Sequence, residues 1–206
     1  MDYEAPQGRR VNGIGAYFTH GPAAGAFYHE TYVRFPLPKG LTPEAAQQLA
    51  RAADAGAGAV PPPALVPKLV AAFTKQAAKQ QVQLSDFGII DGPVVVTFIW
   101  KLAGRPEGAS PAWRRVRPLH VVLDNYSVHH SEEVRAALPA LNAAGIFLVY
   151  LPAYCPELSG IEPQWQTLKH HELTERSFAH LGTLKQKVDA ALTQRAATLR
   201  EAARQK

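Results

Sequence analysis

The chain has 206 residues, of which 47% are hydrophobic, and it carries a formal net charge of +5. This length suits one large domain or one domain with an insertion, and no apolar run reaches the roughly 18–20 residues that span a bilayer. Cys155 is the only cysteine, which excludes an internal disulfide and any multi-cysteine zinc site. Because the start of the chain lacks the pattern of a secretory signal, we expect a cytoplasmic protein. Its positive charge favours a polyanionic partner.

The first half of the chain predicts a hairpin followed by helices. Residues 9–18 and 26–34 are strand-like runs separated by a loop rich in Gly and Pro, which indicates an antiparallel hairpin. The composition then turns to Ala, Gln, Gly and Pro, and we expect a helical insertion over residues 36–88. Caps and apolar spacing predict three helices in this half, over residues 42–55, 65–81 and 91–102.

The second half predicts a βαβ unit. A basic, Pro-containing connection leads into a strand over residues 119–124, and a second strand is expected over residues 146–151. The helix between them has Ser131 as its N-cap and Gly145 just past its end. A βαβ unit makes its two strands parallel, so their carboxyl ends share the edge of the sheet where ligands bind. Two more helices are predicted, over residues 161–173 and 181–203.

Two acidic residues lie at that edge. Asp124 ends the first strand of the unit, and Glu162 follows the second strand after a Pro-rich turn. Carboxylates at adjacent strand ends are typical of sites that hold divalent metal ions for phosphoryl transfer. The alternative for Asp124 is an Asx turn or loop cap, and the alternative for Glu162 is a first-turn acid favoured by the helix dipole.

Both acids belong to a longer pattern. Asp124 and His129 lie in Leu-Asp-Asn-x-x-x-His, and residues 151–165 read Leu-Pro-x-Tyr-x-Pro-Glu-Leu-x-x-Ile-Glu-Pro-x-Trp, followed by Lys169-His-His. This pattern resembles the DDE transposases of the mariner superfamily, and most closely their bacterial insertion-sequence branch. The resemblance is strong over residues 119–189 and fainter over residues 8–33.

The resemblance implies an RNase H-like fold, a mixed sheet flanked by helices, with three catalytic acids that bind Mg²⁺ or Mn²⁺ in a two-metal site. Such enzymes cut transposon ends and join the freed 3′-hydroxyls to target DNA. By this match Asp124 is the second acid and Glu162 the third. The implied partners are double-stranded DNA, as transposon ends and target, and further copies of the chain in a homo-oligomer. The implied location is the cytoplasm, with association to the nucleoid through DNA.

The resemblance also departs from the family pattern. Ser159-Gly160 stand where the commonest pattern has Asn-Pro. The first acid of the family lies on a strand ahead of the segment that begins at Gly8, and we find no counterpart, since none of four other aspartates follows an apolar strand: Asp2, Asp54, Asp86 and Asp91. We therefore expect residues 1–206 to be a partial RNase H-like DDE catalytic domain that lacks the first strand, the first acid and activity on its own.

Other residues have expected supporting roles, each beside a plainer alternative. Asn125, His129 and Trp165 would support the acids, although a loop histidine with a local hydrogen bond and a tryptophan packed beneath a helix are ordinary features. Contacts to DNA are expected from four basic residues: Lys169, His170, Arg114 and Arg115. Two function hypotheses follow, a transposase catalytic core and a non-catalytic remnant that binds DNA or a full-length transposase. A metal phosphoesterase of another kind would have the histidine-rich ligand clusters that this sequence lacks.

Overall fold

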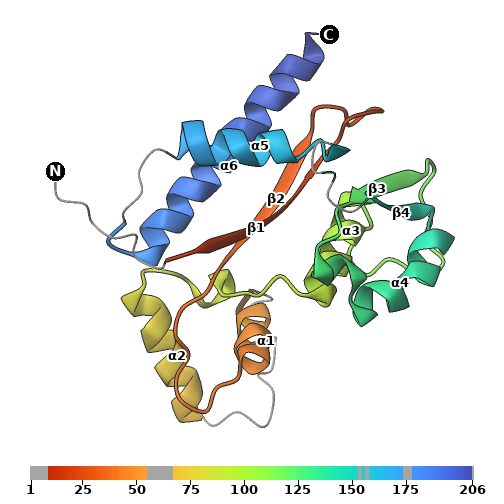
Figure 1. The fold of residues 1–206 in the computed structure, drawn as a ribbon. Helices are drawn as coiled ribbons and strands as arrows, with labels where there is room; N and C mark the ends of the chain where they lie inside the picture. Colours follow the sequence, from red (N-terminus) through yellow and green to blue (C-terminus); the bar gives the residue numbers. More distant parts are fainter. Residues whose placement is uncertain (1–8, 55–66, 153–154, 156–157, 174–177, 206) are drawn as a thin grey trace. The chain divides into compact units, whose positions relative to one another are not determined.

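The computed structural model describes residues 9–54, 67–152, 155, 158–173 and 178–205 (Figure 1). The chain divides into two compact units. The first unit lies within Met1–Gly13, His29–Ile89 and Thr167–Thr198. The second unit lies within Ile14–Tyr28, Ile90–Gln166 and Leu199–Lys206. Helices and strands occur together, which confirms the predicted α/β class.

The predicted hairpin is present. β1 (Val11–Tyr17) pairs with β2 (Phe27–Val33) in a two-stranded sheet. Two backbone bonds close its loop, from the Phe18 N–H to the Ala26 carbonyl at 2.9 Å and from the Gly25 N–H to the Phe18 carbonyl at 2.8 Å. Gly25 has a φ of +82°, a left-handed conformation that costs glycine little and other residues more.

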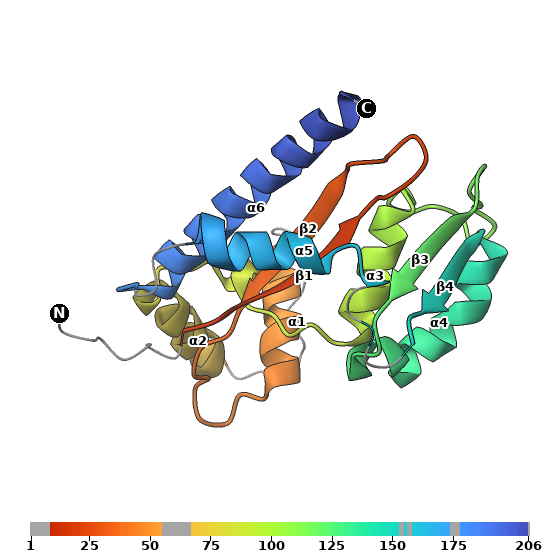
Figure 2. The same cartoon turned by 45° about the horizontal axis from the view of Figure 1, so that its top comes forward.

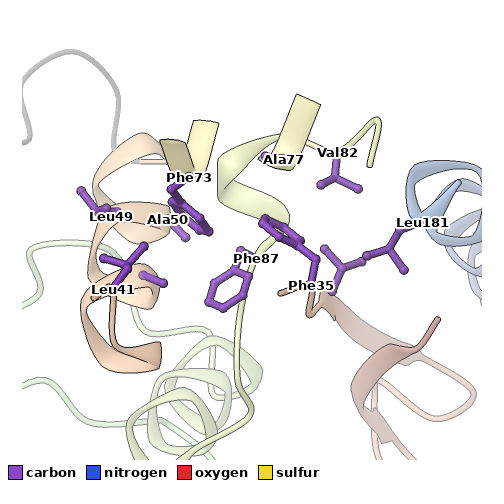
Figure 3. Close-up of a cluster of buried hydrophobic side chains, with 11 residues drawn as sticks. Phe35, Leu41, Leu49, Ala50, Phe73, Ala77, Val82, Phe87 and Leu181 are labelled. Carbon is purple, nitrogen blue, oxygen red and sulfur yellow. The ribbon is translucent and has the colours of Figure 1, made fainter. Parts of the chain in front are cut away.

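The first unit has an aromatic core. It contains α1 (Pro43–Asp54), α2 (Pro67–Lys79) and the larger part of α6 (Leu181–Arg204). Phe35 and Phe73 stack with ring centroids 5.5 Å apart, and Phe87 meets Phe73 edge-on at 5.3 Å (Figure 3). Aliphatic side chains surround the rings: Val33, Leu41, Leu49, Val82 and Leu181.

Helical positions in the first unit follow the predictions closely. α1 and α2 lie within the predicted ranges, and residues 55 and 65–66 of those ranges fall outside the described residues. A short 3₁₀ turn at Leu84–Asp86, which the sequence did not indicate, joins α2 to the segment that leads into the second unit. The Ala- and Gln-rich residues therefore contribute to a core together with the end of β2 and the start of α6.

The second unit contains the predicted βαβ arrangement. β3 (Leu119–Leu123) and β4 (Ile146–Tyr150) pair in parallel, with Leu119 opposite Ile146 and Leu123 opposite Tyr150. α4 (Glu132–Ala143) connects them, and α3 (Gly92–Leu102) precedes them, as Figure 2 shows. The crossover and the parallel pairing confirm the sequence prediction for this stretch.

Local capping explains where these helices begin. The Asp91 carboxylate accepts a hydrogen bond from the Val94 N–H at 3.0 Å, and the Ser131 hydroxyl accepts one from the Val134 N–H at 3.4 Å. Each side chain satisfies one of the backbone donors that a first helical turn leaves without an intrahelical partner. Asp91 thus acts as the N-cap that its sequence context predicts.

The β3–β4 sheet has one packed face and one exposed face. Leu119, Val121 and Leu148 pack against the buried cluster formed by α3, α4 and Ile146. The alternate positions face outward: Val122 is 55% exposed and Val149 is 45% exposed. Because successive strand residues point to opposite faces, Asp124 belongs to the same face as Val122.

The described strands form two separate two-stranded sheets, β1–β2 and β3–β4. In the part of the chain that the structure describes, no strand joins the two pairs, so the single mixed sheet of the RNase H-like expectation is not confirmed. The RNase H-like arrangement stays a prediction. None of the described helices combines the length and apolar character needed to cross a membrane.

The predicted helix over residues 161–173 differs in detail. α5 (Glu162–Thr167) is a regular α-helix, and Leu168–Glu172 continues it as a π-helical turn. The Leu173 N–H donates to the Leu168 carbonyl, five residues earlier, at 2.9 Å. Hydrophobic spacing does not distinguish an α-turn from a π-turn, so the sequence predicted one uninterrupted helix.

Candidate active site

Asp124 follows β3 directly, at the carboxyl end of the parallel pair. Its side chain is 53% exposed. The carboxylate oxygen Oδ1 accepts a hydrogen bond from the Tyr126 N–H at 3.1 Å, which is an Asx turn, and lies 2.9 Å from Nδ1 of His129. No hydrogen bond or ion pair reaches Oδ2 from the described residues. Within the described part of the chain, the carboxylate is thus held through Oδ1, which leaves Oδ2 as the oxygen that could meet a cation.

The tautomer of His129 follows from its neighbours. Nδ1 lies 3.1 Å from the Asp124 carbonyl oxygen and 2.9 Å from Asp124 Oδ1. A carbonyl oxygen only accepts hydrogen bonds, so Nδ1 carries a hydrogen and donates it. The His129 side chain is 17% exposed, so a partly buried imidazole holds the more exposed carboxylate of Asp124.

Asn125 ties the same loop to the neighbouring strand. Its amide Nδ2 donates to the Leu151 carbonyl at 2.6 Å, and its Oδ1 lies 3.1 Å from Nε2 of His130. The His130 ring stacks on Tyr150, with centroids 4.5 Å apart. The sequence prediction included Asn125 but missed His130 and Tyr150. The only available signal was an adjacent His-His pair and an aromatic residue at the end of the second strand.

Glu162 opens α5 and is half-buried. Among the described residues, none makes a hydrogen bond or an ion pair with its carboxylate. Trp165, one turn later, meets the ring of Phe27 edge-on at 5.7 Å. A Cβ atom at Gly15 would lie 2.8 Å from the Trp165 ring, so the indole packs directly over the backbone of β1. Trp165 therefore helps to orient the helix that begins with Glu162.

The acidic residues fit a divalent cation only in part. Carboxylate oxygens are the ligands that Mg²⁺ and Mn²⁺ prefer, and Asp124 offers an accessible one. The described residues contain no group of three or more His, Cys, Asp or Glu side chains that could hold a metal ion. The described part of the chain therefore supplies individual ligands without a complete three-ligand centre.

Arg114 and Arg115 lie at the opposite end of β3 from Asp124. The five residues of β3 lie between them and Asp124, and the strand is about 16 Å long, since a strand rises about 3.3 Å per residue. The guanidinium of Arg115 is used within the chain, where it donates to the Ala103 carbonyl and, at 3.0 Å, to the Arg117 carbonyl. Arg114 is exposed. Arg114 therefore has a side chain free to reach a phosphate, whereas Arg115 braces the loop.

Lys169 and His170 lie in the π-helical turn that continues α5, and both are exposed. This turn belongs to the first unit, whereas Asp124, Glu162 and Trp165 belong to the second. The structure places Lys169 and His170 on the same continuous helical segment as Glu162.

Comparison with known proteins gives a match over a stretch that includes the βαβ unit. A search of curated proteins found no match to this chain. Residues 88–185 match the family model described as DDE superfamily endonuclease. The matched range includes α3, the parallel pair, Asp124, α5 and Glu162. This match supports a DDE transposase-type domain over residues 88–185 of the chain.

Proposed function

We propose that this chain is the catalytic-core portion of a DNA transposase, a nuclease that cleaves and joins DNA by metal-dependent phosphoryl transfer. The observation that carries the proposal is the position of Asp124 within the DDE-type stretch. It lies at the carboxyl end of a parallel strand pair, with one carboxylate oxygen held by the protein and the other unbonded among the described residues. Origin from the mariner superfamily, and from its insertion-sequence branch, forms part of the proposal.

The residues of the site have separate roles in this proposal. Asp124 and Glu162 would hold Mg²⁺ or Mn²⁺, and such ions would activate the attacking oxygen and stabilise the leaving oxygen of the phosphodiester. His129 holds the Asp124 carboxylate, and Asn125 fixes its loop to the Leu151 carbonyl. Trp165 orients the helix of Glu162 by packing over β1.

The proposed substrate is double-stranded DNA, with transposon ends and target sites bound by a homo-oligomer of the complete enzyme. Arg114, Lys169 and His170 provide exposed contacts to the phosphate backbone. The distance of about 16 Å between the two ends of β3 is roughly half a helical turn of B-DNA, so one duplex can reach both ends. Binding of this kind weakens steeply as salt rises, because it releases counterions.

One observation favours a second candidate function. The described residues do not assemble three metal-ligating side chains, and the family resemblance lacks a first acid in this chain. A chain with two of three acids would bind DNA, or a full-length transposase, without cutting DNA. The absence of the first acid from the chain stays a prediction.

A nicking assay separates the two functions. Supercoiled plasmid is incubated with the 206-residue chain in Mg²⁺ or Mn²⁺, and in EDTA. If the chain is catalytic, Asp124→Asn and Glu162→Gln each lower the nicking rate by at least about 100-fold, because even a residue behind a metal ligand contributes 10–100-fold. Glu107→Gln, which removes the same charge from an exposed loop, leaves the rate unchanged.

The outcomes are distinct. Nicking that persists in Asp124→Asn refutes the role of this carboxylate. Salt-sensitive DNA binding by the wild-type chain without any nicking supports the non-catalytic candidate. Robust metal-dependent nicking by the wild-type chain contradicts the prediction that the chain is inactive on its own.

A further inference from the structure

Tyr150 holds two consecutive residues of the loop that carries Asp124. It is the last residue of β4, and its hydroxyl donates a hydrogen bond to the His129 carbonyl at 2.9 Å. Its ring also stacks on His130, with centroids 4.5 Å apart and planes inclined by 23°. A single side chain on the neighbouring strand thus fixes both the backbone of His129 and the ring of His130.

His130 passes this restraint to Asn125. Since the Asn125 amide nitrogen donates to the Leu151 carbonyl, its Oδ1 is the acceptor that faces Nε2 of His130, and Nε2 carries the hydrogen. The His130 carbonyl accepts two bonds from the Arg135 guanidinium, at 2.8 and 2.6 Å. The loop is therefore held at its first residues by Asn125 and at its last residues by His130.

The consequence for Asp124 comes through His129. The imidazole reaches Asp124 Oδ1 only if the backbone of His129 keeps its position. Among the described residues, the Tyr150 hydroxyl is the side-chain group that bonds to that backbone. Nδ1 of His129 and the Tyr126 N–H are both directed at Oδ1, so among the described residues Oδ2 is the carboxylate oxygen without a bonded partner. Loss of the Tyr150 bond would free the imidazole and let the carboxylate rotate between its two oxygens.

We propose that Tyr150, aided by His130, is a positioning residue that acts through His129 to select which oxygen of Asp124 faces a metal ion. This inference rests on the proposed function, in which Asp124 is a metal ligand. Residues behind a metal ligand typically contribute 10–100-fold to metal affinity. The tyrosine acts without touching the ion.

The test uses paired tyrosine variants of the full chain. Tyr150→Phe deletes the hydroxyl and keeps the ring that stacks on His130. Tyr28→Phe is the matched control, because it removes a hydroxyl from an exposed residue of the hairpin. A second variant, His130→Phe, keeps an aromatic ring against Tyr150 and deletes the bond to Asn125. Three quantities are measured: Mn²⁺ affinity by electron paramagnetic resonance, the tautomer of His129 by ¹⁵N NMR without metal, and the melting temperature.

We expect the wild-type chain and Tyr28→Phe to show His129 as one tautomer, with hydrogen on Nδ1. Tyr150→Phe should give a mixture of tautomers and an affinity for Mn²⁺ about 10–100-fold weaker, at temperatures far below melting. His130→Phe should shift both quantities in the same direction. A merely structural role would lower the melting temperature and leave the tautomer and the affinity of the folded protein unchanged.

Failure of this inference differs from failure of the proposed function. If the wild-type chain binds Mn²⁺ and Tyr150→Phe binds it equally well with an unchanged His129 tautomer, the positioning role is refuted. If the wild-type chain binds no Mn²⁺, the proposed metal function fails, and the tautomer alone decides whether Tyr150 positions His129. If Tyr150→Phe does not fold, the same readouts in His130→Phe decide.

Discussion

Charged side chains form a cluster around Lys185 of α6 in the first unit. Lys185 lies 2.7 Å from Asp189 and 3.3 Å from Asp86, and Thr31 donates a hydrogen bond to Asp189. Burial lowers the pKa of Lys185, but the hydrogen bond to Asp189 and the charge of Asp86 outweigh it, so the pKa is raised. The stability from this raised pKa is fully present below the ordinary lysine value and is lost only as pH rises through the folded-state value.

His29 faces the same cluster and responds in the opposite direction. Burial lowers its pKa below the ordinary value of 6.5, against the attraction of Asp189 and Glu30 and together with the repulsion from Lys185. Because the pKa of His29 is lowered in the folded state, the folded chain binds a proton at this residue less readily than the unfolded chain does. The unfolded chain therefore gains protons first as pH falls below about 6.5, and the folded state loses stability there.

This sign gives a prediction for stability. The free energy of unfolding of the wild-type chain should fall between pH 7.5 and pH 5 by more than that of His29→Phe, since phenylalanine cannot be protonated. Urea titrations at the two pH values measure the difference. His20→Gln, a change at an exposed histidine, should retain the wild-type slope. Equal slopes for His29→Phe and the wild type would refute the role of His29.

The close approach of β1 and α5 at Gly15 fixes the position of the helix that begins with the proposed metal ligand Glu162. A Cβ at Gly15 would lie 2.8 Å from one Trp165 ring carbon, 3.1 Å from another and 3.3 Å from Ile161. A methyl group there requires the indole to move, because such short approaches are almost never seen. The absence of a side chain at Gly15 is therefore what allows α5 to pack over the strand.

We predict that Gly15→Ala destabilises the chain by about 1–3 kcal/mol, the usual cost of overpacking. In a strand with open space at this position, the change from Gly to Ala is stabilising. A loss of stability in Gly15→Ala therefore indicates that the Trp165 ring occupies this space. Thermal unfolding and a shift in tryptophan fluorescence measure the effect. Gly160→Ala, whose new methyl would meet Thr19 at an ordinary 3.4 Å, is the control and should be tolerated. An unchanged melting temperature in Gly15→Ala would argue against this packing.

Among the described residues, buried apolar side chains form one cluster in each of the two compact units. The first unit buries the aromatic cluster around Phe73, and the second buries an aliphatic cluster around Leu141, and both side chains are 0% exposed. Each core draws its members from one unit. Local opening of a protein follows such units when few core contacts are shared.

Amide hydrogen exchange should therefore separate the two cores. Leu141→Ala leaves a cavity and should lower the free energy of unfolding by about 2–5 kcal/mol. We expect faster exchange in α3, α4 and β4, while α1 and α2 keep their protection. Phe73→Ala is the reciprocal variant and should raise exchange in α1 and α2 first. Mass spectrometry of peptic fragments gives the measurement. A uniform rise across both units in either variant would show that the chain opens as one cooperative body.

Much of the local structure was predictable from the sequence. The Asp91 and Ser131 caps and the βαβ pattern predict α3, α4, β3 and β4, because these signals act over a few residues. The same short-range signals place Asp124 at a strand end and Glu162 at a helix start.

Which distant residues contact one another was decided only by the tertiary structure. The sequence contains no signal that the Tyr150 hydroxyl bonds to His129 or that the Arg115 guanidinium donates to the Ala103 carbonyl. It also does not show that the Trp165 ring packs where only a glycine fits. These contacts join residues brought together by packing, so periodicity along the chain does not encode them. The sequence by itself determined which residues are proposed to carry the chemistry. The tertiary structure determined which oxygen of Asp124 the described residues hold, because the Tyr126 N–H and the His129 ring converge on Oδ1.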